Sequence, residues 1–163
     1  MMGWGWLLLM VLPIAGPEPC DLQGYRQAYR EACGDFKNRD VVEGFLADMI
    51  AAVADCPEEP IAAGYQAAAG LMSAGLPWNP MEALQRFNEW TPVLEASIEA
   101  APDNPDLRFL RLGVQTNVPA IVGYRGEIEG DLALIQAALR EGHWQDAPAF
   151  EAFVGQTLSE LQP

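Results

Sequence analysis

Apolar residues recur every three or four positions along most of the chain after residue 20, a spacing that places them on one face of a helix. The first two series are separated only by the short stretch GDFKN, residues 34 to 38. They consist of Leu22, Tyr25, Tyr29 and Ala32, and of Val42, Phe45, Met49 and Val53. Because so short a connection leaves the second helix beside the first, the pattern predicts an antiparallel helical hairpin.

Five further segments carry the same spacing, and glycine, proline or asparagine separates them. Their apolar positions are Ile61, Tyr65, Ala68 and Met72; Met81, Leu84, Phe87, Leu94 and Ile98; Leu107, Leu110, Val114 and Val118; Ile128, Leu132, Ile135 and Leu139; and Phe150, Phe153, Val154, Leu158 and Leu161. No stretch alternates convincingly between apolar and polar residues, so no sheet is expected. The predicted fold is all-α, with antiparallel helical hairpins stacked as a short array of about six to seven helices.

Two details refine this pattern. The third segment, which begins near Ile61, is rich in alanine, and small side chains imply close packing between helices. In the fourth segment, Thr91 and Pro92 have the sequence of a helix cap and a first helical position, so that helix is predicted to kink or restart there.

A faint internal repeat supports stacking. The stretches ADCPEEPIAAGY, residues 54 to 65, and EAAPDNPDLRFL, residues 99 to 110, share two prolines three positions apart and are offset by 45 residues. That offset suits a repeat of helical hairpins, each of which needs its neighbour to cover its apolar face.

The second of these stretches also carries a resemblance. IEAAPDNPDLRFLRLG, residues 98 to 113, is similar to the helix-to-helix junction of tetratricopeptide repeats (TPR). Over residues 60 to 140 the chain resembles an uncharacterised family of small secreted bacterial helical proteins, most specifically in RFLRLGVQTNVP with GY and IEGD behind it. Pro92 and the cysteines depart from that pattern. The resemblance implies a TPR-like fold and a location outside the cytoplasm, and it implies no mechanism.

The N-terminal segment 1–16 is predicted to be a secretory signal. Its apolar run, residues 4 to 14, is much shorter than the roughly 20 residues that span a bilayer, and the small residues Ala15 and Gly16 follow it. Residues 20–163 have the size of a single domain, with no membrane span expected after the signal. We therefore expect an exported bacterial protein, periplasmic or extracellular.

Three cysteines test this prediction, because an exported chain is expected to oxidise at least one pair. Cys20 precedes the first predicted helix and Cys56 follows the second, so an antiparallel hairpin places both at the same end. Cys33 lies at the other end, beside the turn. The predicted disulfide is therefore Cys20–Cys56, and Cys33 is interpreted as a small core residue near a helix end.

Charge narrows the possible partners. The chain holds 23 acidic and nine basic residues, a formal net charge of -14, and a surface of that sign repels phosphate backbones and anionic headgroups. No nucleic-acid partner is predicted, whereas cationic, metallic or apolar partners remain compatible with the composition.

The fifth predicted helix carries a polar strip between two apolar faces, which indicates a helix packed on both sides. The strip consists of Arg108, Arg111 and Gln115. Guanidinium groups in a packed interior must be paired, since an unpaired buried charge costs several kcal/mol. In one interpretation these arginines pin the fifth helix to Glu127 or Asp131 of the sixth.

The neighbouring polar residues have a different role in each of two interpretations. In the first, Asn117 and Tyr124 satisfy the backbone that Pro119 leaves without a hydrogen bond. In the second, Arg108, Arg111, Gln115 and Tyr124 line a groove that receives an anionic group such as a peptide carboxylate.

The usual signatures of catalysis are absent from the sequence. His143 is the only histidine and no cysteine pair has zinc spacing, so neither a metal site nor a cofactor is predicted. There is no glycine-rich phosphate loop and no GxSxG elbow. A dyad of Cys33 and His143 has no supporting motif, and His143 beside Trp144 is interpreted as a surface residue at a helix end.

Trp78 and Trp90 flank the fourth segment, where tryptophans either cap a core or anchor a partner. Together the patterns favour an exported helical-repeat module that binds or scaffolds an unknown protein or peptide without catalytic activity. Two alternatives stay open. One is a carrier that holds a small apolar or anionic ligand between helices, and the other is an enzyme of unfamiliar design that uses arginine and carboxylates.

Overall fold

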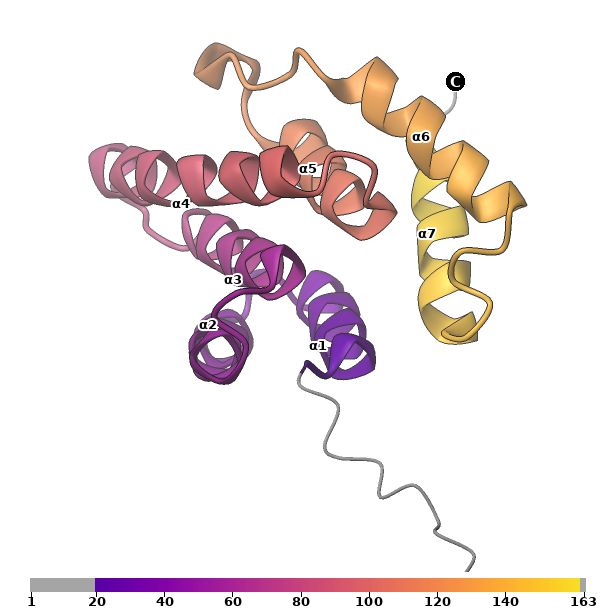
Figure 1. The fold of residues 1–163 in the computed structure, drawn as a ribbon. Helices are drawn as coiled ribbons and strands as arrows, with labels where there is room; N and C mark the ends of the chain where they lie inside the picture. The colour runs from indigo at the N-terminus through magenta and orange to yellow at the C-terminus, as the bar shows by residue number, and fades with distance from the viewer. Residues whose placement is uncertain (1–19, 162–163) are drawn as a thin grey trace, which may run out of the picture.

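The computed structural model describes residues 20–161, which form seven α-helices and one short 3-10 helix, η1 (Figure 1). The described part of the chain contains no strand, so the all-α prediction is confirmed. The predicted signal, residues 1–16, lies outside the described residues. The elements are α1 Leu22–Gly34, α2 Arg39–Asp55, α3 Pro60–Ser73, α4 Pro80–Ala100, α5 Pro105–Asn117, η1 Ala120–Val122, α6 Ile128–Arg140 and α7 Pro148–Leu161.

Local sequence explains where the helices begin. Asn38, Asn79 and Asn104 precede α2, α4 and α5, and each side chain accepts a hydrogen bond from a backbone amide of the first turn. Such caps contribute about 1 kcal/mol each. Proline occupies the first position of α3, α4 and α5, where its missing amide hydrogen costs nothing.

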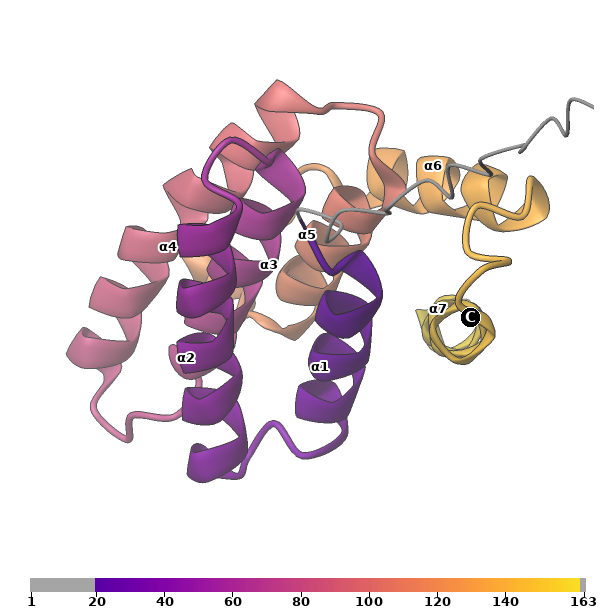
Figure 2. The same ribbon diagram turned by 60° about the horizontal axis from the view of Figure 1, so that its bottom comes forward.

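Helices α2, α3 and α4 lie side by side in one layer, and α3 also packs against α1 and α5 (Figure 2). The central position of α3 depends on its small residues, as its composition predicted. Gly64 leaves room for the side chain of Leu107, and Gly70 leaves room for the indole of Trp90. An added Cβ at either glycine would lie little more than 2 Å from those side chains.

Helix α4 passes through Pro92 without a break, so the prediction of a restart at Thr91 is wrong. The hydroxyl of Thr91 does not cap a new helix and instead donates to the carbonyl of Phe87, at 2.7 Å. Pro92 is exposed, and so is Asn88, whose carbonyl loses its usual amide partner. Because that carbonyl lies on a solvent-facing side, it stays accessible to water, and the missing bond does not end the helix.

The Cys20–Cys56 disulfide is present, with a Cα–Cα distance of 5.9 Å, and confirms the predicted pairing and hairpin register. Cys33 lies near the other end of α1 and is only partly exposed. Burial raises the pKa of its thiol to about 11, despite a hydrogen bond with Tyr29 that acts in the opposite direction. Cys33 is thus a poorly reactive thiol in the folded chain.

Helix α7 is joined to the rest by aromatic side chains. Phe109 of α5 contacts Phe150 and Phe153 of α7, with ring centroids 5.7 and 5.6 Å apart, and Tyr29 of α1 contacts Phe153 at 6.3 Å. These rings fill the space that separates the α7 ribbon from α1 and α5 in Figure 1. Among the helices described here, none is long and apolar enough to cross a bilayer.

Candidate functional site: two buried carboxylates around α5

The arginine strip predicted on α5 meets a fully buried carboxylate of α6, Asp131. Arg111 donates to it twice, from Nε to Oδ2 at 2.8 Å and from Nη2 to Oδ1 at 2.7 Å. Arg108 donates from Nη1 to Oδ1 at 3.0 Å. The two arginines therefore share one carboxylate, and α6 packs along α5 as the ion-pair interpretation requires.

The remaining donors of Arg111 reach α4 and the start of α6. Its Nη1 donates to Glu95 Oε2 at 2.9 Å, and Glu127 lies at the longer distance of 3.9 Å from Nη2. Hydrogen bonds from the guanidinium to Asp131, together with the nearby carboxylate charges, raise the pKa of Arg111. The network of Arg108, Arg111, Asp131, Glu95 and Glu127 thus ties three helices together.

Tyr124 joins this network in a way the sequence did not indicate. Its hydroxyl donates to Glu95, and burial followed by that hydrogen bond raises the pKa of the phenol. The prediction that Tyr124 satisfies backbone groups near Pro119 is therefore wrong, because its partner is a side chain. Arg125 makes a backbone contact there instead, from Nη2 to the carbonyl of Val118 at 2.8 Å.

Gln115 of the predicted strip and Asn117 at the end of α5 take no part in the ion pairs. Asn117 is exposed and its side-chain amide donates to the carbonyl of Gly113 at 2.7 Å, which is not the Gln115 carbonyl that Pro119 leaves without an amide partner. Gln115 is buried, and its Oε1 has no hydrogen-bond partner among the described residues. Neither side chain is hydrogen-bonded to Arg111 among the described residues.

This arrangement favours the strut interpretation of α5 over the groove. Arg111 is only 4% exposed, and its nitrogens already contact the carboxylates of Asp131 and Glu95. An anionic ligand would have to displace those carboxylates from a buried position, which costs several kcal/mol. The geometry gives a ligand no such access.

A second buried carboxylate, Asp106, lies at the start of α5 and was not predicted from the sequence. It is 1% exposed and accepts a two-point ion pair from Arg26 of α1, Nε–Oδ1 at 2.8 Å and Nη2–Oδ2 at 2.9 Å. Tyr65 of α3 donates to it at 2.9 Å. His143 Nε2 and Trp144 Nε1, from the α6–α7 connection, lie 3.1 and 3.2 Å from Oδ2.

The partners of Asp106 determine its ionisation. Burial alone would raise the pKa of this carboxyl group, but the hydrogen bonds from Arg26, His143 and Tyr65 and the Arg26 charge outweigh burial. The resulting pKa is about 2. A carboxylate held this firmly in its ionised form is a weak proton acceptor at neutral pH, so its role is to join α1, α3, α5 and the α6–α7 connection.

The sequence did contain a signal for this site. Arg26 falls inside the apolar face of α1, between Tyr25 and Tyr29, just as Arg111 falls inside α5. A buried arginine implies a buried acid, but spacing along the chain does not identify a partner 80 residues away. His143 is also more than a surface residue at a helix end, because its side chain, 35% exposed, contacts Asp106.

The two tryptophans proposed as anchors behave differently. Trp90 packs on Gly70 between α4 and α3, whereas Trp78, before α4, is 96% exposed. Met81 and Leu84, in the first turns of α4, are 72% and 44% exposed. We call Trp78, Met81 and Leu84 the Trp78 patch. An open hollow of about 470 Å³ adjoins it, lined by Asn79, Met81, Glu82, Leu84, Gln85 and Asn88.

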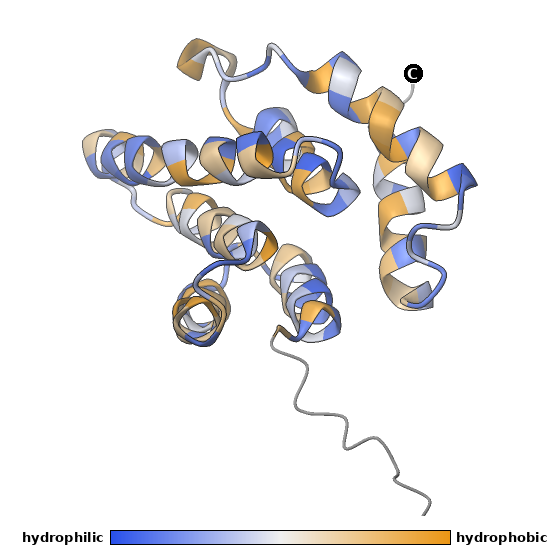
Figure 3. Cartoon of the chain, in the orientation of Figure 1, coloured by the Kyte–Doolittle hydropathy of each residue, from blue (hydrophilic) through white to orange (hydrophobic). Residues whose placement is uncertain are grey.

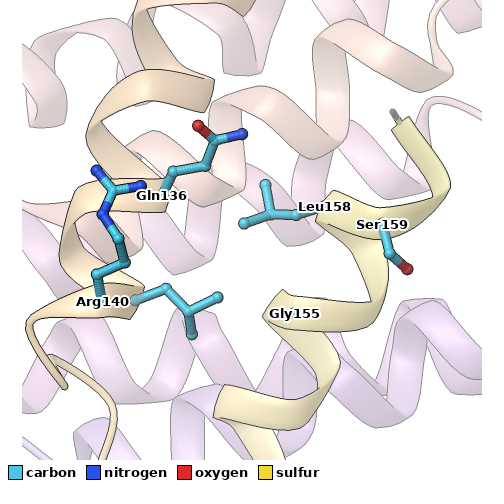
Figure 4. Close-up of a pocket in the computed structure, with 6 residues that line it drawn as sticks. Gln136, Arg140, Gly155, Leu158 and Ser159 are labelled. Atoms are coloured by element: carbon cyan, nitrogen blue, oxygen red, sulfur yellow. The ribbon is translucent and has the colours of Figure 1, made fainter. Parts of the chain in front are cut away.

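A second open hollow, of about 370 Å³, lies between α6 and α7 (Figure 4). Its walls are Gln136, Leu139 and Arg140 of α6 and Gly155, Leu158 and Ser159 of α7. Leu158 points from α7 towards α6, while Gln136 and Arg140 extend from the opposite wall (Figure 4). The hollow combines a small apolar area with one cationic side chain.

No group of histidine, cysteine, aspartate or glutamate side chains within residues 20–161 is arranged to hold a metal ion. Both buried carboxylates are instead paired with arginine. Comparison with known proteins adds no relative: no protein-family model matches the chain, and neither a curated protein nor a solved structure is detectably similar to it.

Proposed function

We propose that the chain is an exported, TPR-like helical module that binds a protein or peptide partner without catalysing a reaction, and that the partner docks on the Trp78 patch. The observation that carries this proposal is the exposure of Trp78, at 96%, three and six residues before the exposed side chains of Met81 and Leu84. Tryptophan is strongly enriched among the residues that dominate binding energy at protein interfaces. Contiguous exposed apolar side chains are typical of such interfaces.

The distribution of exposed apolar residues supports the same surface. Three of the six large apolar side chains that are exposed in the described chain fall between residues 78 and 84. The others are Phe36 in the turn between α1 and α2, Ile50 of α2 and Ile121 of η1. Isolated apolar residues are normal on protein surfaces, whereas a cluster that includes tryptophan indicates a contact site.

The buried networks support a binding role over a catalytic one. Asp106 and Asp131 are paired with arginine, and the low pKa of Asp106 makes it unsuited to proton transfer near neutral pH. The same ion pairs and the disulfide fix the helices relative to one another. A surface held in place before binding loses less conformational entropy when a partner docks.

The export part of the proposal rests on two observations. Disulfides form and persist in oxidising compartments, and Cys20 and Cys56 are bonded. The apolar N-terminal run has the length of a secretory signal. Both fit a protein of the bacterial envelope or exterior.

A small-molecule carrier is the second candidate, and the hollow between α6 and α7 favours it. Leu139 and Leu158 provide apolar contact, and Arg140 provides a positive charge. Ligand pockets usually enclose most of the ligand, whereas this hollow is open, so the Trp78 patch is the better-supported site.

The test replaces Trp78 with a photo-crosslinking amino acid in the protein produced by its native cells. We expect irradiation to yield a discrete crosslinked species whose partner is identified by mass spectrometry. The same probe at Phe36, which is 53% exposed, serves as the control for accessible apolar positions. Crosslinking that is absent at Trp78, or identical at both positions, contradicts the proposal.

A further inference from the structure

We propose that the segment that occupies the Trp78 patch is an amphipathic helix with lysine or arginine along its polar side. This inference rests on the proposed function, because it identifies the chemistry of the partner at the same site. Three observations carry it: the direction of the hollow along α4, the covering of a neighbouring side of α4, and the charges on this part of the helix.

The hollow follows one helical stripe of α4. Four residues that line it, Met81, Leu84, Gln85 and Asn88, have the spacing i, i+3, i+4 and i+7. Side chains at this spacing form a straight row along a helix. A row of apolar and amide side chains beside a groove is the surface on which an amphipathic helix lays its own apolar stripe.

A neighbouring side of α4 is already covered by the segment that follows η1. The ring of Phe87 contacts that of Tyr124, with centroids 5.6 Å apart, and Tyr124 also donates to Glu95. At 100° per residue, Glu95 falls within about 20° of Leu84 around the helix axis. The connection that follows η1, above α4 in Figure 1, therefore lies against α4 at Phe87 and Glu95 and leaves Met81, Leu84, Gln85 and Asn88 exposed.

Most large apolar side chains outside residues 78–84 are covered by neighbouring helices. Helix α7 carries both orange and blue segments in Figure 3, and its buried residues, Phe150, Val154 and Leu158, belong to the hydrophobic core. Trp78 and Met81 have no comparable cover from residues 20–161. An external helix would extend the packing that the Tyr124 segment begins.

The charges beside the hollow select a cationic partner. Glu82 and Arg86 form an ion pair at 2.8 Å, which uses the one positive charge on this part of α4. Glu89, one turn after Gln85, is exposed and has no ion-pair partner among the described residues, so it leaves a net negative charge on this part of α4. The chain as a whole carries a formal charge of -14. A second copy would bring like charges together at this surface, whereas a basic helix is attracted to it.

The test compares two synthetic helical peptides with the same leucine stripe, one with lysine and one with glutamate on the polar side. Binding to the full chain is measured by fluorescence anisotropy of the labelled peptides. We expect the lysine peptide to bind and the glutamate peptide to bind at least about tenfold more weakly. Increasing salt is expected to weaken the lysine peptide further.

Variants separate docking from general attraction to an acidic protein. Trp78→Ser leaves the net charge unchanged, and we expect it to weaken the lysine peptide at least about tenfold. Phe36→Ser is the matched control and is expected to bind as the native chain does. Because both side chains are exposed, circular dichroism should show the native fold in each variant.

Each other outcome overturns the inference. Equal binding of the lysine peptide to the native chain and to Trp78→Ser means that the attraction is diffuse. Equal binding of both peptides contradicts the inference that the partner is cationic. A Trp78-dependent dimer seen by sedimentation contradicts it too, because the occupant would then be a second copy of the chain. Crosslinking at Trp78 in native cells stays informative in all of these cases, so a failure of this inference is distinguishable from a failure of the proposed function.

Discussion

Arg26 of α1 and Asp106 of α5 form a buried two-point ion pair, with hydrogen bonds of 2.8 and 2.9 Å between residues 80 positions apart. Both side chains are almost completely buried. A buried pair of this kind adds little net stability compared with apolar residues, but it is costly to break, because one charge remains without a partner. The pair therefore constrains how α1 lies against α5.

Replacing Asp106 with asparagine should be strongly destabilising. The variant keeps the shape of the side chain but leaves the Arg26 guanidinium buried without its main counter-charge. We expect the free energy of unfolding, measured with urea, to fall by about 3–5 kcal/mol. Asp103→Asn changes an exposed residue of the connection before α5 and should remain within about 0.5 kcal/mol of the native chain.

A double variant makes the explanation specific. Arg26→Met combined with Asp106→Leu removes both charges, so it should recover a large part of the stability lost in Asp106→Asn. If the double variant were less stable than the single one, loss of the other partners of Asp106, Tyr65 among them, would be the cause.

Acid should weaken the fold through the same residue. The pKa of Asp106 is about 2 in the folded chain and its ordinary value is 3.8, so the ionised group stabilises the fold above that ordinary value. This contribution, about 2 kcal/mol, is lost as pH falls from about 4 through about 2. Urea unfolding over that range should show a steeper loss of stability for the native chain than for Asp106→Asn. Parallel curves would contradict the assignment.

The difference between what the sequence predicted and what it missed has a physical basis. The spacing of apolar residues can be recognised within one segment, without knowledge of its neighbours, so the seven helices could be predicted. The short turn between the first two helices then placed Cys20 beside Cys56. The ion pair of Arg111 with Asp131 could be predicted because Asp131 belongs to the next helix, whereas its pair with Glu95 of the preceding helix was missed. Asp106 was missed because an acidic residue after Pro105 is ordinary in a first helical turn. Its partners come from three other parts of the chain.

The strut interpretation of α5 predicts that Arg111→Leu is destabilising. Asp131 would keep only the single hydrogen bond from Arg108, and Glu95 would lose its arginine. We expect a loss of about 3 kcal/mol in the free energy of unfolding. Arg39→Leu, which removes an exposed ion pair with Glu43, should cost about 0.5 kcal/mol or less. Native stability of Arg111→Leu together with loss of a bound partner would support the groove instead.

Loss of the disulfide should affect stability more than loss of the third cysteine. The bond closes a loop between residues 36 positions apart, which corresponds to about 4 kcal/mol in the chain-entropy model. We expect the variant with serine at Cys20 and Cys56 to lose free energy of unfolding of that order. Cys33→Ser is the control, and urea unfolding of both variants is the measurement. Equal effects would mean that the bond does not constrain the unfolded chain.

Close packing of α3 on α4 can be tested at Gly70. A Cβ atom there would lie 2.2 Å from Cδ2 and 2.4 Å from Cε2 of the Trp90 indole, a rigid ring that must move as a whole. Overpacking of this kind costs about 1–3 kcal/mol, so Gly70→Ala should be destabilising although alanine is the better helix former. Gly44→Ala in α2 is the matched control, because nothing lies within 4 Å of its Cβ position, and it should gain about 0.5–1 kcal/mol.

A variant at Trp90 tests whether this side chain is the reason that Gly70 cannot be replaced. Replacing Trp90 with leucine removes the ring that the new methyl group would meet, at the cost of the contacts that the indole makes. In that background Gly70→Ala should become neutral or stabilising, because only the helix preference of alanine remains. A double-mutant cycle from four urea titrations gives the coupling between the two positions, and it is expected to exceed about 1 kcal/mol. A coupling near zero would mean that Trp90 does not set the distance between α3 and α4.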